Sequence, residues 1–258
     1  MLSVVIITKN EAKNIKRCLE SVLWADEIIV LDSSSTDKTI EIAQQFTKKV
    51  FSTPSEDWLG YGVQKQRALA YATGDWVLNL DADECLTPTL QQVIQSAIRS
   101  DRYDAYRIPI HMCFYNKPLR YSSSPTRHIR LFKRVGAQYS SDIVHEKINL
   151  SIHSRVGQLQ TPIMHHSFQD LSHALYKMNK YSSSSARIRL ANHKKTTLFK
   201  TILGSSWMFF RCYILQRGCL EGASGFILAV LQAQGTFYRG IKQLYPDSQW
   251  QDPQDHGR

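Results

Sequence analysis

The sequence has few cysteines, and no two of them are closely spaced. The five are Cys18, Cys85, Cys113, Cys212 and Cys219. An odd number without C-x-x-C spacing argues against a disulfide framework, and the N-terminus lacks the apolar core of a signal peptide. These absences predict a cytoplasmic protein that folds in a reducing compartment.

Long hydrophobic runs are also missing. A membrane-spanning helix needs roughly 18 or more consecutive apolar residues. The best candidate, WMFFRCYIL from Trp207 to Leu215, is shorter and contains Arg211. We therefore expect no membrane span, although 258 residues with 43% hydrophobic content are enough to bury a sizeable core.

Acidic residues are scarce in the second part of the chain. Residues 1–104 hold 11 Lys and Arg against 15 Asp and Glu, whereas residues 105–258 hold 21 against 7. Such a basic part suits nucleic acid, an anionic membrane surface or a phosphorylated substrate, and a simply solvated surface is an equal alternative. We do not expect nucleic-acid binding, because the first part is acidic and no helix-turn-helix, zinc or aromatic–basic RNA motif is present.

Short apolar runs rich in β-branched residues alternate with segments of helical periodicity over the first hundred residues. The expected strands are residues 2–8, 27–32, 49–51 and 76–81. Helices are expected between them, the first with Asn10 as its N-cap, and a further one begins with the capping pair Thr87 and Pro88. This alternation predicts an α/β fold with a parallel sheet covered on both faces.

Polar residues follow three of the predicted strands. They are Thr8-Lys9-Asn10-Glu11, Asp32-Ser33-Ser34-Ser35 and Asp81-Ala82-Asp83. Ligands of open α/β sheets bind at the carboxyl ends of strands, so these segments should border one crevice. Asp81 and Asp83 would point to one side of an extended backbone, as oxygen ligands suited to Mg²⁺ or Mn²⁺. Alternatively, these acids cap the next helix or surround a solvated turn.

Three linked stretches occur in a recognisable order and spacing: VVIITKNEAKNI, DEIIVLDSSSTDKT and GYGVQKQRALAYATGDWVLNLDADE. Together they resemble the nucleotide-sugar domain of the inverting family 2 glycosyltransferases, which have the GT-A fold with a mixed, mainly parallel sheet. The later segments RHIRLFKR, DIVHEKI and HHSF look like those of the bacterial lipopolysaccharide core heptose β-1,4-glucosyltransferases. The resemblance implies a UDP-glucose donor, a lipopolysaccharide core acceptor and an Mg²⁺ or Mn²⁺ cofactor.

The resemblance also implies roles in donor binding. The residues that match the nucleotide-sugar site are Thr8, Asn10, Glu11, Asp32, Lys65, Arg67 and Asp81. Asp32 would hydrogen-bond the uracil. Lys65 would lie near the diphosphate, but the Asn that usually follows it is Gln66 here, which leaves Arg67 as an alternative.

A metal site is implied in the same way. Asp83 matches the direct metal ligand, and Asp81 would face the ribose or a metal-bound water. His165 or His166 could complete the coordination, and simple packing before the next helix is the alternative. A cation there would stabilise the negative charge on the departing UDP.

An inverting displacement also needs a base that takes the proton of the acceptor hydroxyl. If the stretch DIVHEKI is a strand, His145 and Glu146 point to opposite sides. The resemblance favours Glu146 as the base and leaves Asp142 in reserve. For His145, an ordinary imidazole at a strand end is as good an interpretation as a catalytic one.

Changes of pattern along the chain suggest its organisation. We expect residues 1–104 to bind the nucleotide sugar and residues 105–169 to form the β-rich acceptor side of the same domain. We expect residues 170–245 to be helical and either to contact the cytoplasmic face of the inner membrane or to pack on the first domain or another subunit. Residues 246–258 should be disordered.

Basic residues on the acceptor side could contact phosphate groups of a lipopolysaccharide core. They are Arg127, Arg130, Lys133 and Arg134. We expect most of them to be solvated surface, because residues on a strand alternate between its two faces.

The sequence thus predicts an inverting hexosyltransferase. One alternative is a GT-A transferase with another sugar nucleotide and another cell-envelope acceptor. A nucleotidyltransferase on a similar sheet is disfavoured, because no glycine-rich phosphate loop follows Thr8.

Overall fold

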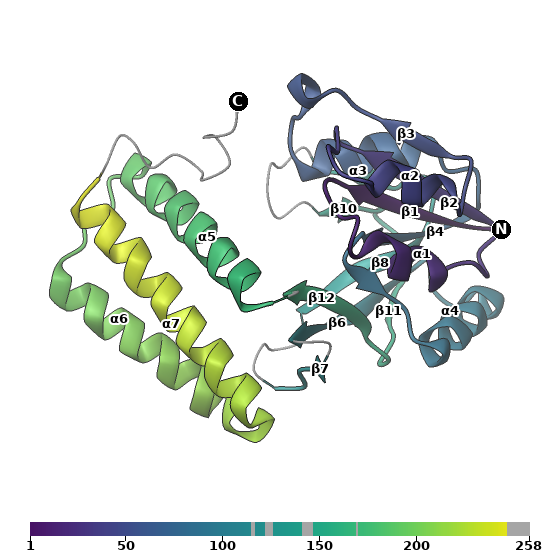
Figure 1. Cartoon of the computed structure of the whole chain (residues 1–258). Coiled ribbons are helices and arrows are strands. Elements are labelled where there is room, and N and C mark those ends of the chain that lie inside the picture. Colours follow the sequence, from purple (N-terminus) through teal and green to yellow (C-terminus); the bar gives the residue numbers. More distant parts are fainter. Residues whose placement is uncertain (115–116, 122–125, 141–146, 169, 247–258) are drawn as a thin grey trace. The chain divides into compact units, whose positions relative to one another are not determined.

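The computed structural model describes the chain apart from residues 115–116, 122–125, 141–146, 169 and 247–258. It forms two compact units (Figure 1). The first contains residues 1–111 and 126–166, and the second contains residues 112–125 and 167–258. The stretch that carries Asp142, His145 and Glu146 lies outside the described residues, as does all of the predicted tail after Pro246.

The first unit is centred on a parallel sheet made of the predicted strands. β1 (Leu2–Thr8) pairs with β2 (Glu27–Asp32) and β4 (Trp76–Asp81), and β3 (Val50–Ser52) pairs with the far side of β2. Every residue of β1 and β2 is buried. Because both faces of these strands are covered, their sequences are near-continuous apolar runs and do not alternate with polar residues.

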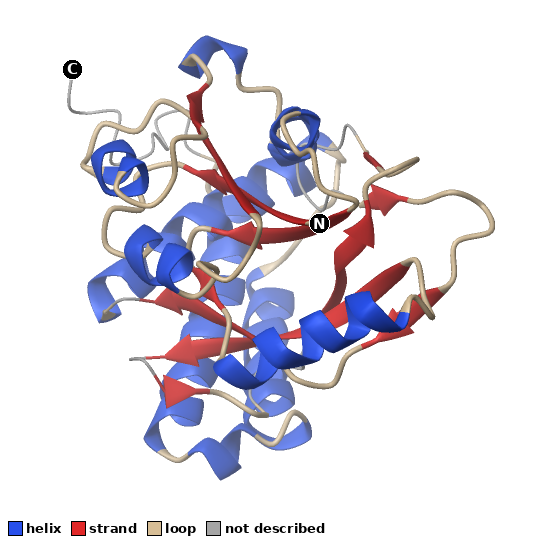
Figure 2. Cartoon of the chain, turned by 90° about the vertical axis from the view of Figure 1, so that its right-hand side faces the viewer, coloured by secondary structure: helices blue, strands red, loops and turns tan. Residues whose placement is uncertain are grey.

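Helices cover the two faces of this sheet. α1 (Ile15–Glu20), α2 (Thr39–Gln44) and α4 (Pro88–Ser100) pack with Val4 and Ile6 of β1, whereas α3 (Tyr61–Ala70) packs with Val5 and Ile7. A short 3-10 helix, η1 (Ser55–Asp57), precedes α3. Figure 2 shows the strands with helices on both sides of them. The α/β architecture predicted from periodicity is therefore confirmed.

Antiparallel strands extend the sheet beyond β4. β8 (Thr126–Lys133) pairs antiparallel with β4 and β6 (Ala105–Phe114), and β12 (Ile163–Phe168) pairs antiparallel with β5 (Glu84–Cys85). The sheet order is β3-β2-β1-β4-β8-β6-β12-β5. β7 (Lys117–Pro118) and β11 (Val156–Gln158) also pair with β6, while β9 (Gln138–Tyr139) and β10 (Ile148–Asn149) form a separate hairpin. The sheet is mixed, as predicted.

The two predicted helix caps have different outcomes. Thr87 caps α4 by accepting a hydrogen bond from the Leu90 backbone N–H at 3.2 Å, as predicted. Asn10 does not cap α1, which begins at Ile15 after Asn14. Asn10 has a φ of 55°, and its side-chain oxygen accepts a hydrogen bond from the Thr36 backbone N–H at 2.8 Å. That prediction was wrong because the Asn10 side chain bonds the loop after β2 and not the first turn of α1.

The second unit is mainly helical. It contains α5 (Leu171–Ala191), α6 (Leu198–Phe210) and α7 (Ala223–Leu244), with the short π-helix η2 (Arg211–Leu215) and the 3-10 helix η3 (Gly218–Glu221) between α6 and α7. α7 packs against both α5 and α6. Of the helices that the structure describes, none has the length and hydrophobicity needed to cross a membrane.

Candidate active site

The register of the parallel strands brings three polar strand ends to one edge of the sheet. Thr8 is paired with Asp32, and Asp81 is paired with Ile7, the residue before Thr8. Thr8 and Asp32 are buried, and the Asp81 side chain is 33% exposed. This arrangement follows from parallel pairing, which places the carboxyl ends of neighbouring strands side by side.

The loops after β1 and β2 are bonded to each other around Asp32. The Asp32 carboxylate accepts hydrogen bonds from the backbone N–H of Ser35 at 2.7 Å and from the Ser35 hydroxyl. The Ser35 hydroxyl oxygen in turn accepts the Asn10 backbone N–H at 2.8 Å, and the Glu11 N–H donates to the Thr39 hydroxyl at 2.8 Å. Asn10, Glu11 and Asp32 therefore belong to one hydrogen-bonded loop pair.

Two residues that the sequence did not single out join this loop pair. The Thr53 backbone N–H donates to the Asp32 carbonyl at 2.8 Å, and the Thr53 hydroxyl donates to Gln64 Oε1 at 3.4 Å. Thr53 comes directly after β3, so the strand-end rule applied to the third strand would have found it. Gln64 lies in the first turns of α3, and no sequence pattern marks it as a site residue.

Two buried polar atoms here have no hydrogen-bond partner among the residues that the structure describes. They are the Thr8 hydroxyl oxygen and Gln64 Nε2. Buried polar groups are nearly always paired, so an unpaired acceptor and donor next to a sheet edge indicate a place for a polar ligand. Thr8 was among the residues predicted to line the nucleotide site, and Gln64 was not.

Asp81 lies between two cations. Lys65 Nζ, on α3, is 3.0 Å from one carboxylate oxygen of Asp81, and the Arg130 guanidinium is 2.9 Å from the other. Burial alone would raise the pKa of Asp81, but Arg130 and Lys65 hold that pKa well below its usual range. Asp81 therefore stays ionised with both oxygens held in place.

Arg130 is buried, although most of the four basic residues of this segment were expected to be solvated surface. It is only 7% exposed, and besides Asp81 it contacts Asn79 Oδ1 at 3.0 Å and Glu84 Oε1 at 2.7 Å. Burial and the neighbouring charge of Asp81 raise the pKa of Glu84 despite Arg130. The alternation of faces along β8 did not predict that the Arg130 side chain points toward Asp81 and Glu84.

The neighbours of Lys65 have other contacts. Arg67 Nη1 donates to the backbone carbonyl of Asp57 at 3.0 Å. Gln66 accepts a hydrogen bond from the Tyr139 backbone N–H at 2.8 Å and so fastens α3 to the β9–β10 hairpin. Lys65, and not Arg67, is the basic residue of α3 for which a contact with Asp81 is observed.

Asp83 contacts His165, although 82 residues separate them in the sequence. His165 Nε2 is 3.0 Å from Asp83 Oδ2, because β12 pairs with β5 so that His165 lies opposite Glu84. Burial lowers the pKa of His165, but the hydrogen bond and the charge of Asp83 outweigh it and raise that pKa to about 8.

His166 points to a different set of groups. Its Nδ1 is 2.6 Å from Arg17 Nη1, and its Nε2 is 3.5 Å from the Cys85 sulfur. Burial and the charge of Arg17 lower the pKa of His166 to about 4. Of the two histidines, His165 is the one beside the acids.

The Asp83–His165 pair fits part of a divalent metal site. Two adjacent ligands of an octahedral cation with bonds of about 2.1 Å lie about 3 Å apart, which matches the spacing of this oxygen and nitrogen. Among the described residues, no group of three or more His, Cys, Asp or Glu side chains is arranged to hold a metal. Within the described part of the chain, this pair could therefore supply two ligands, and a substrate or water could supply others.

The predicted bases cannot be placed, because Asp142, His145 and Glu146 lie outside the described residues. The residues on either side of that stretch can be placed. Ser140 and Lys147 are joined by a hydrogen bond from the Ser140 N–H to the Lys147 carbonyl at 2.8 Å, next to the β9–β10 pair. Through Tyr139 and Gln66, the same hairpin is bonded to the helix that carries Lys65.

Known proteins similar to this chain include glycosyltransferases of several bacteria and an archaeon. Residues 3–169 match the model of glycosyl transferase family 2. An uncharacterized glycosyltransferase of Rickettsia felis is 33% identical over 254 residues, which cover 93% of this chain and 88% of that protein. The lipopolysaccharide core biosynthesis glycosyltransferase LpsC of Rhizobium meliloti is 30% identical over 253 residues, covering 93% and 91%.

A solved structure supports the fold. The mannosyltransferase PcManGT from Pyrobaculum calidifontis, in complex with GDP-Man and Mn²⁺, has a TM-score of 0.50 and 13% identity, and the match covers 96% of this chain and 88% of the other. The predicted GT-A fold is therefore confirmed. Because the family match includes the strand ends that carry Thr8, Asp32, Asp81 and Asp83, and two relatives align over nearly the whole chain, this protein belongs to the family 2 glycosyltransferases, which transfer sugars from nucleotide donors.

Proposed function

We propose that this chain transfers glucose from UDP-glucose to the inner-core heptose of lipopolysaccharide, with inversion, in a single displacement. The observation that carries the proposal is the meeting of Thr8, Asp32 and Asp81 at one sheet edge. The neighbouring Asp83–His165 pair supports the metal dependence. The similarity to LpsC supports a lipopolysaccharide core acceptor, and the resemblance of the later motifs supports glucose.

In this proposal the loop pair after β1 and β2 holds the nucleotide. Asp32, the Thr8 hydroxyl and Gln64 Nε2 would hydrogen-bond the uracil, and Asn10 and Glu11 would close the loop over it. Asp81 would face the ribose, because Lys65 and Arg130 hold its carboxylate in one orientation. Lys65, with Arg67 as the alternative, would add positive charge near the diphosphate.

Asp83 and His165 would hold a divalent cation, Mg²⁺ or Mn²⁺. When bound, such a cation stabilises the charge that develops on the departing diphosphate, an effect on the order of several kcal/mol. The contribution of the chain is to supply one carboxylate oxygen and one imidazole nitrogen at adjacent positions. His165 is then a neutral ligand, since the cation takes the place of the proton on Nε2.

Glu146 would remove the proton of the acceptor hydroxyl, with Asp142 in reserve and His145 beside them. We expect Glu146→Gln to bind UDP-glucose normally and to lose about 10²- to 10⁴-fold in turnover, because proton transfer contributes that much. Donor binding is measured by calorimetry and turnover by single-turnover kinetics. Asp142→Asn is the matched control and should keep its rate. Lost turnover in Asp142→Asn with normal turnover in Glu146→Gln would assign the base to Asp142. Normal turnover in both variants would contradict a carboxylate base in this stretch.

The substrate assignment is tested with a panel of nucleotide sugars and truncated lipopolysaccharide cores. Product mass and anomeric configuration are the measurements. We expect a β-linked hexose on heptose-terminated cores with UDP-glucose as the donor. Transfer from another sugar nucleotide, or to another cell-envelope acceptor, would replace this proposal by the broader GT-A alternative. Salt-sensitive binding to arbitrary DNA without any use of a sugar nucleotide would favour the nucleic-acid alternative.

A further inference from the structure

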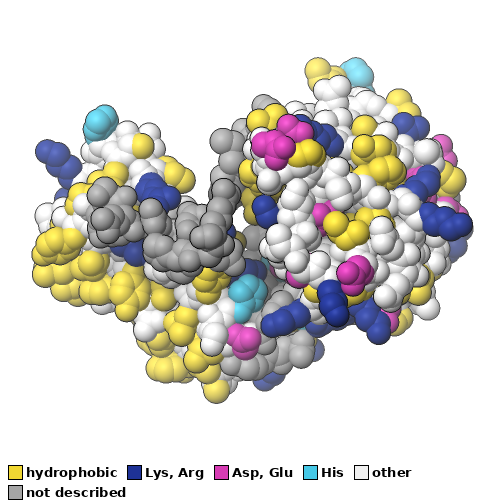
Figure 3. Space-filling view, turned by 45° about the horizontal axis from the view of Figure 1, so that its top comes forward, with side chains coloured by type: hydrophobic (Ala, Val, Ile, Leu, Met, Phe, Trp, Pro, Cys, Tyr) yellow, Lys and Arg dark blue, Asp and Glu magenta, His cyan; other side chains and the backbone are white. Residues whose placement is uncertain are grey.

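Large apolar side chains cover the outer face of α6. Six of them are exposed: Leu198, Phe199, Ile202, Leu203, Trp207 and Phe210. At 3.6 residues per turn these positions fall within about half of the circumference of the helix. Phe199 is 69% exposed and Trp207 is 56% exposed. Hydrophobic side chains gather along the margin of the helical unit in Figure 3.

The inner face of α6 is small and polar. Thr201 is buried against Gly240 of α7, where an added Cβ would overlap the Thr201 side chain. The Ser205 hydroxyl donates to the Ala233 carbonyl of α7 at 2.8 Å. A helix on the surface of a water-soluble protein normally buries its apolar stripe and exposes its polar one. α6 does the reverse, so its apolar face requires another partner.

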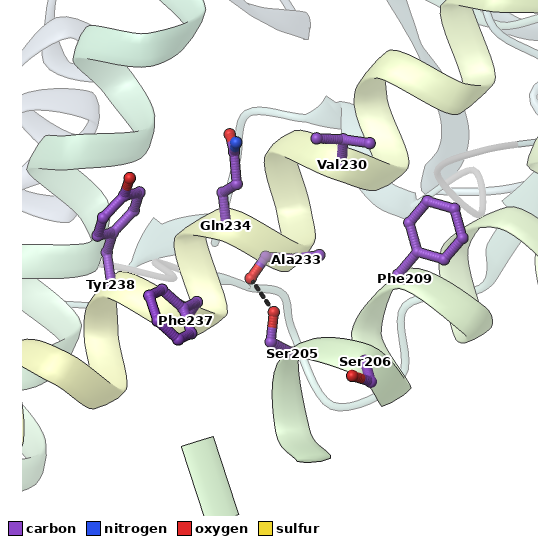
Figure 4. Close-up of a pocket in the computed structure, with 8 residues that line it drawn as sticks. All are labelled: Ser205, Ser206, Phe209, Val230, Ala233, Gln234, Phe237 and Tyr238. Atoms are coloured by element: carbon purple, nitrogen blue, oxygen red, sulfur yellow. Dashed lines mark hydrogen bonds between the residues drawn. The ribbon is translucent and has the colours of Figure 1, made fainter. Parts of the chain in front are cut away.

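A groove between α6 and α7 widens this apolar surface (Figure 4). Its volume is about 500 Å³, and it is lined by Phe209 of α6 and by Val230 and Phe237 of α7, with Ser206, Gln234 and Tyr238 as polar groups. Ser205 and Ala233 also line it and are joined by a hydrogen bond (Figure 4). An open apolar groove with a few polar groups suits a flexible hydrocarbon chain.

The charge of this part of the chain identifies the kind of partner. Residues 171–246 contain eleven Lys and Arg and a single acid, Glu221. Glu221 is buried and accepts hydrogen bonds from the backbone N–H groups of Arg120 and Tyr121, so it does not offset the surface charge. Exposed lysines flank the apolar face at Lys194, Lys195 and Lys200. A second copy would bring an equally basic face, whereas an anionic surface complements it.

We propose that the outer face of α6 docks on an anionic phospholipid bilayer, with the helix lying in the interface and the flanking lysines at the headgroups. The apolar area and the positive charge act together, as in other interfacial helices. Because α6 is too short to span, the contact is peripheral. This inference needs no sugar nucleotide and is independent of the proposed function.

The test is flotation of the full chain with vesicles of neutral phosphatidylcholine alone or mixed with phosphatidylglycerol. We expect binding to the mixed vesicles and weak binding to the neutral ones. The double variant Phe199→Gln with Trp207→Gln should bind at least about tenfold more weakly, since two exposed aromatic anchors are lost. Lys194→Gln with Lys195→Gln should lose about fivefold per charge and make binding less sensitive to salt.

The matched control is Ile152→Gln, which removes a side chain that is 94% exposed in the first unit. It should bind as the wild type does. Thermal unfolding checks that each variant is folded, and light scattering gives the oligomeric state. Absence of binding to the mixed vesicles, or undiminished binding of the aromatic double variant, would overturn the proposal. So would a wild-type dimer that the aromatic variant converts to a monomer without any vesicle binding.

Discussion

At the scale of single residues, the site depends on pairs that are far apart in the chain. Asp83 contacts His165, and Asp81 contacts Arg130 and Lys65. Each acid has a different neighbour, and we therefore propose a different role for each. Asp83 contacts the His165 imidazole, which can lose its proton and become neutral. Asp81 is held between two cations, Lys65 and Arg130, and their positive charge makes it less suited to bind a metal directly.

Asp83→Asn should reduce transfer at least about 100-fold, because an amide is a poorer ligand and several kcal/mol of cation stabilisation are lost. Initial rates are measured while Mn²⁺ or Mg²⁺ is varied, with thermal unfolding as a check of the fold. Glu20→Gln, a change in an exposed acid, is the control and should have no effect. Full wild-type activity in excess chelator would contradict the metal role.

Arg130→Met should destabilise the first unit by about 3–5 kcal/mol, because it leaves the buried acid Glu84 without its observed cationic contact, whereas Asp81 keeps Lys65. Glu84 is fully buried, and Arg130 is its observed cationic contact, at 2.7 Å. The free energy of unfolding in urea is the measurement, and Arg99→Met on the exposed surface of α4 is the control. Adding Glu84→Gln to Arg130→Met should recover part of the loss. A change in the free energy of unfolding below about 1 kcal/mol would contradict a stabilising role of the Arg130–Glu84 pair.

At the scale of elements, the sheet is tied together at the end opposite to the site. Glu27, the first residue of β2, is buried and accepts hydrogen bonds from Lys49, from the Ser3 hydroxyl and from the Thr73 backbone N–H. This one carboxylate thus joins β1, β2, the segment before β3 and the segment before β4. Burial opposes its ionisation, but these hydrogen-bond partners, of which Lys49 has the largest effect, lower the pKa of Glu27 to about 2.

Stability should therefore depend on pH through Glu27. Its pKa falls from an ordinary value of 4.5 to about 2 on folding, so its contribution is complete above pH 4.5 and is lost as the pH falls towards 2. The contribution is at most about 3 kcal/mol. Chemical unfolding of Glu27→Gln at several pH values should show lower stability at pH 7 and a flatter profile between pH 4.5 and 2. Glu41→Gln is the exposed control, and identical profiles for Glu27→Gln and the wild type would contradict the assignment.

Elements also differ in how well the sequence predicts them. The strands β1, β2 and β4 each contain a short run of mostly apolar residues, and these runs identified them. α4 was identified by Thr87 and Pro88, since a cap is a local hydrogen bond. The start of α1 was not predicted, because the Asn10 side chain bonds a loop 26 residues later, and a local pattern contains no such contact.

At the scale of the whole molecule, charge and hydrophobicity are unevenly distributed. The chain is acidic up to residue 104 and basic after it, and the basic part includes a helix whose large apolar side chains face outward. The charge asymmetry could be read from the sequence. The outward direction of the apolar face could not be read from the sequence, because α6 is apolar enough to be a buried helix. Only its packing against α7 through Thr201 and Ser205 shows which side of the helix is covered.

The sequence by itself determined the α/β class, the strands, the polar residues at their ends and the resemblance to a glycosyltransferase family. These features depend on local periodicity and on short motifs, which are contained in neighbouring residues. Only the tertiary structure decided that His165 lies beside Asp83, that Arg130 is buried among the acids, and that Gln64 joins the loop pair. Strand pairing and register bring these residues together, and both result from the packing of segments far apart in the chain.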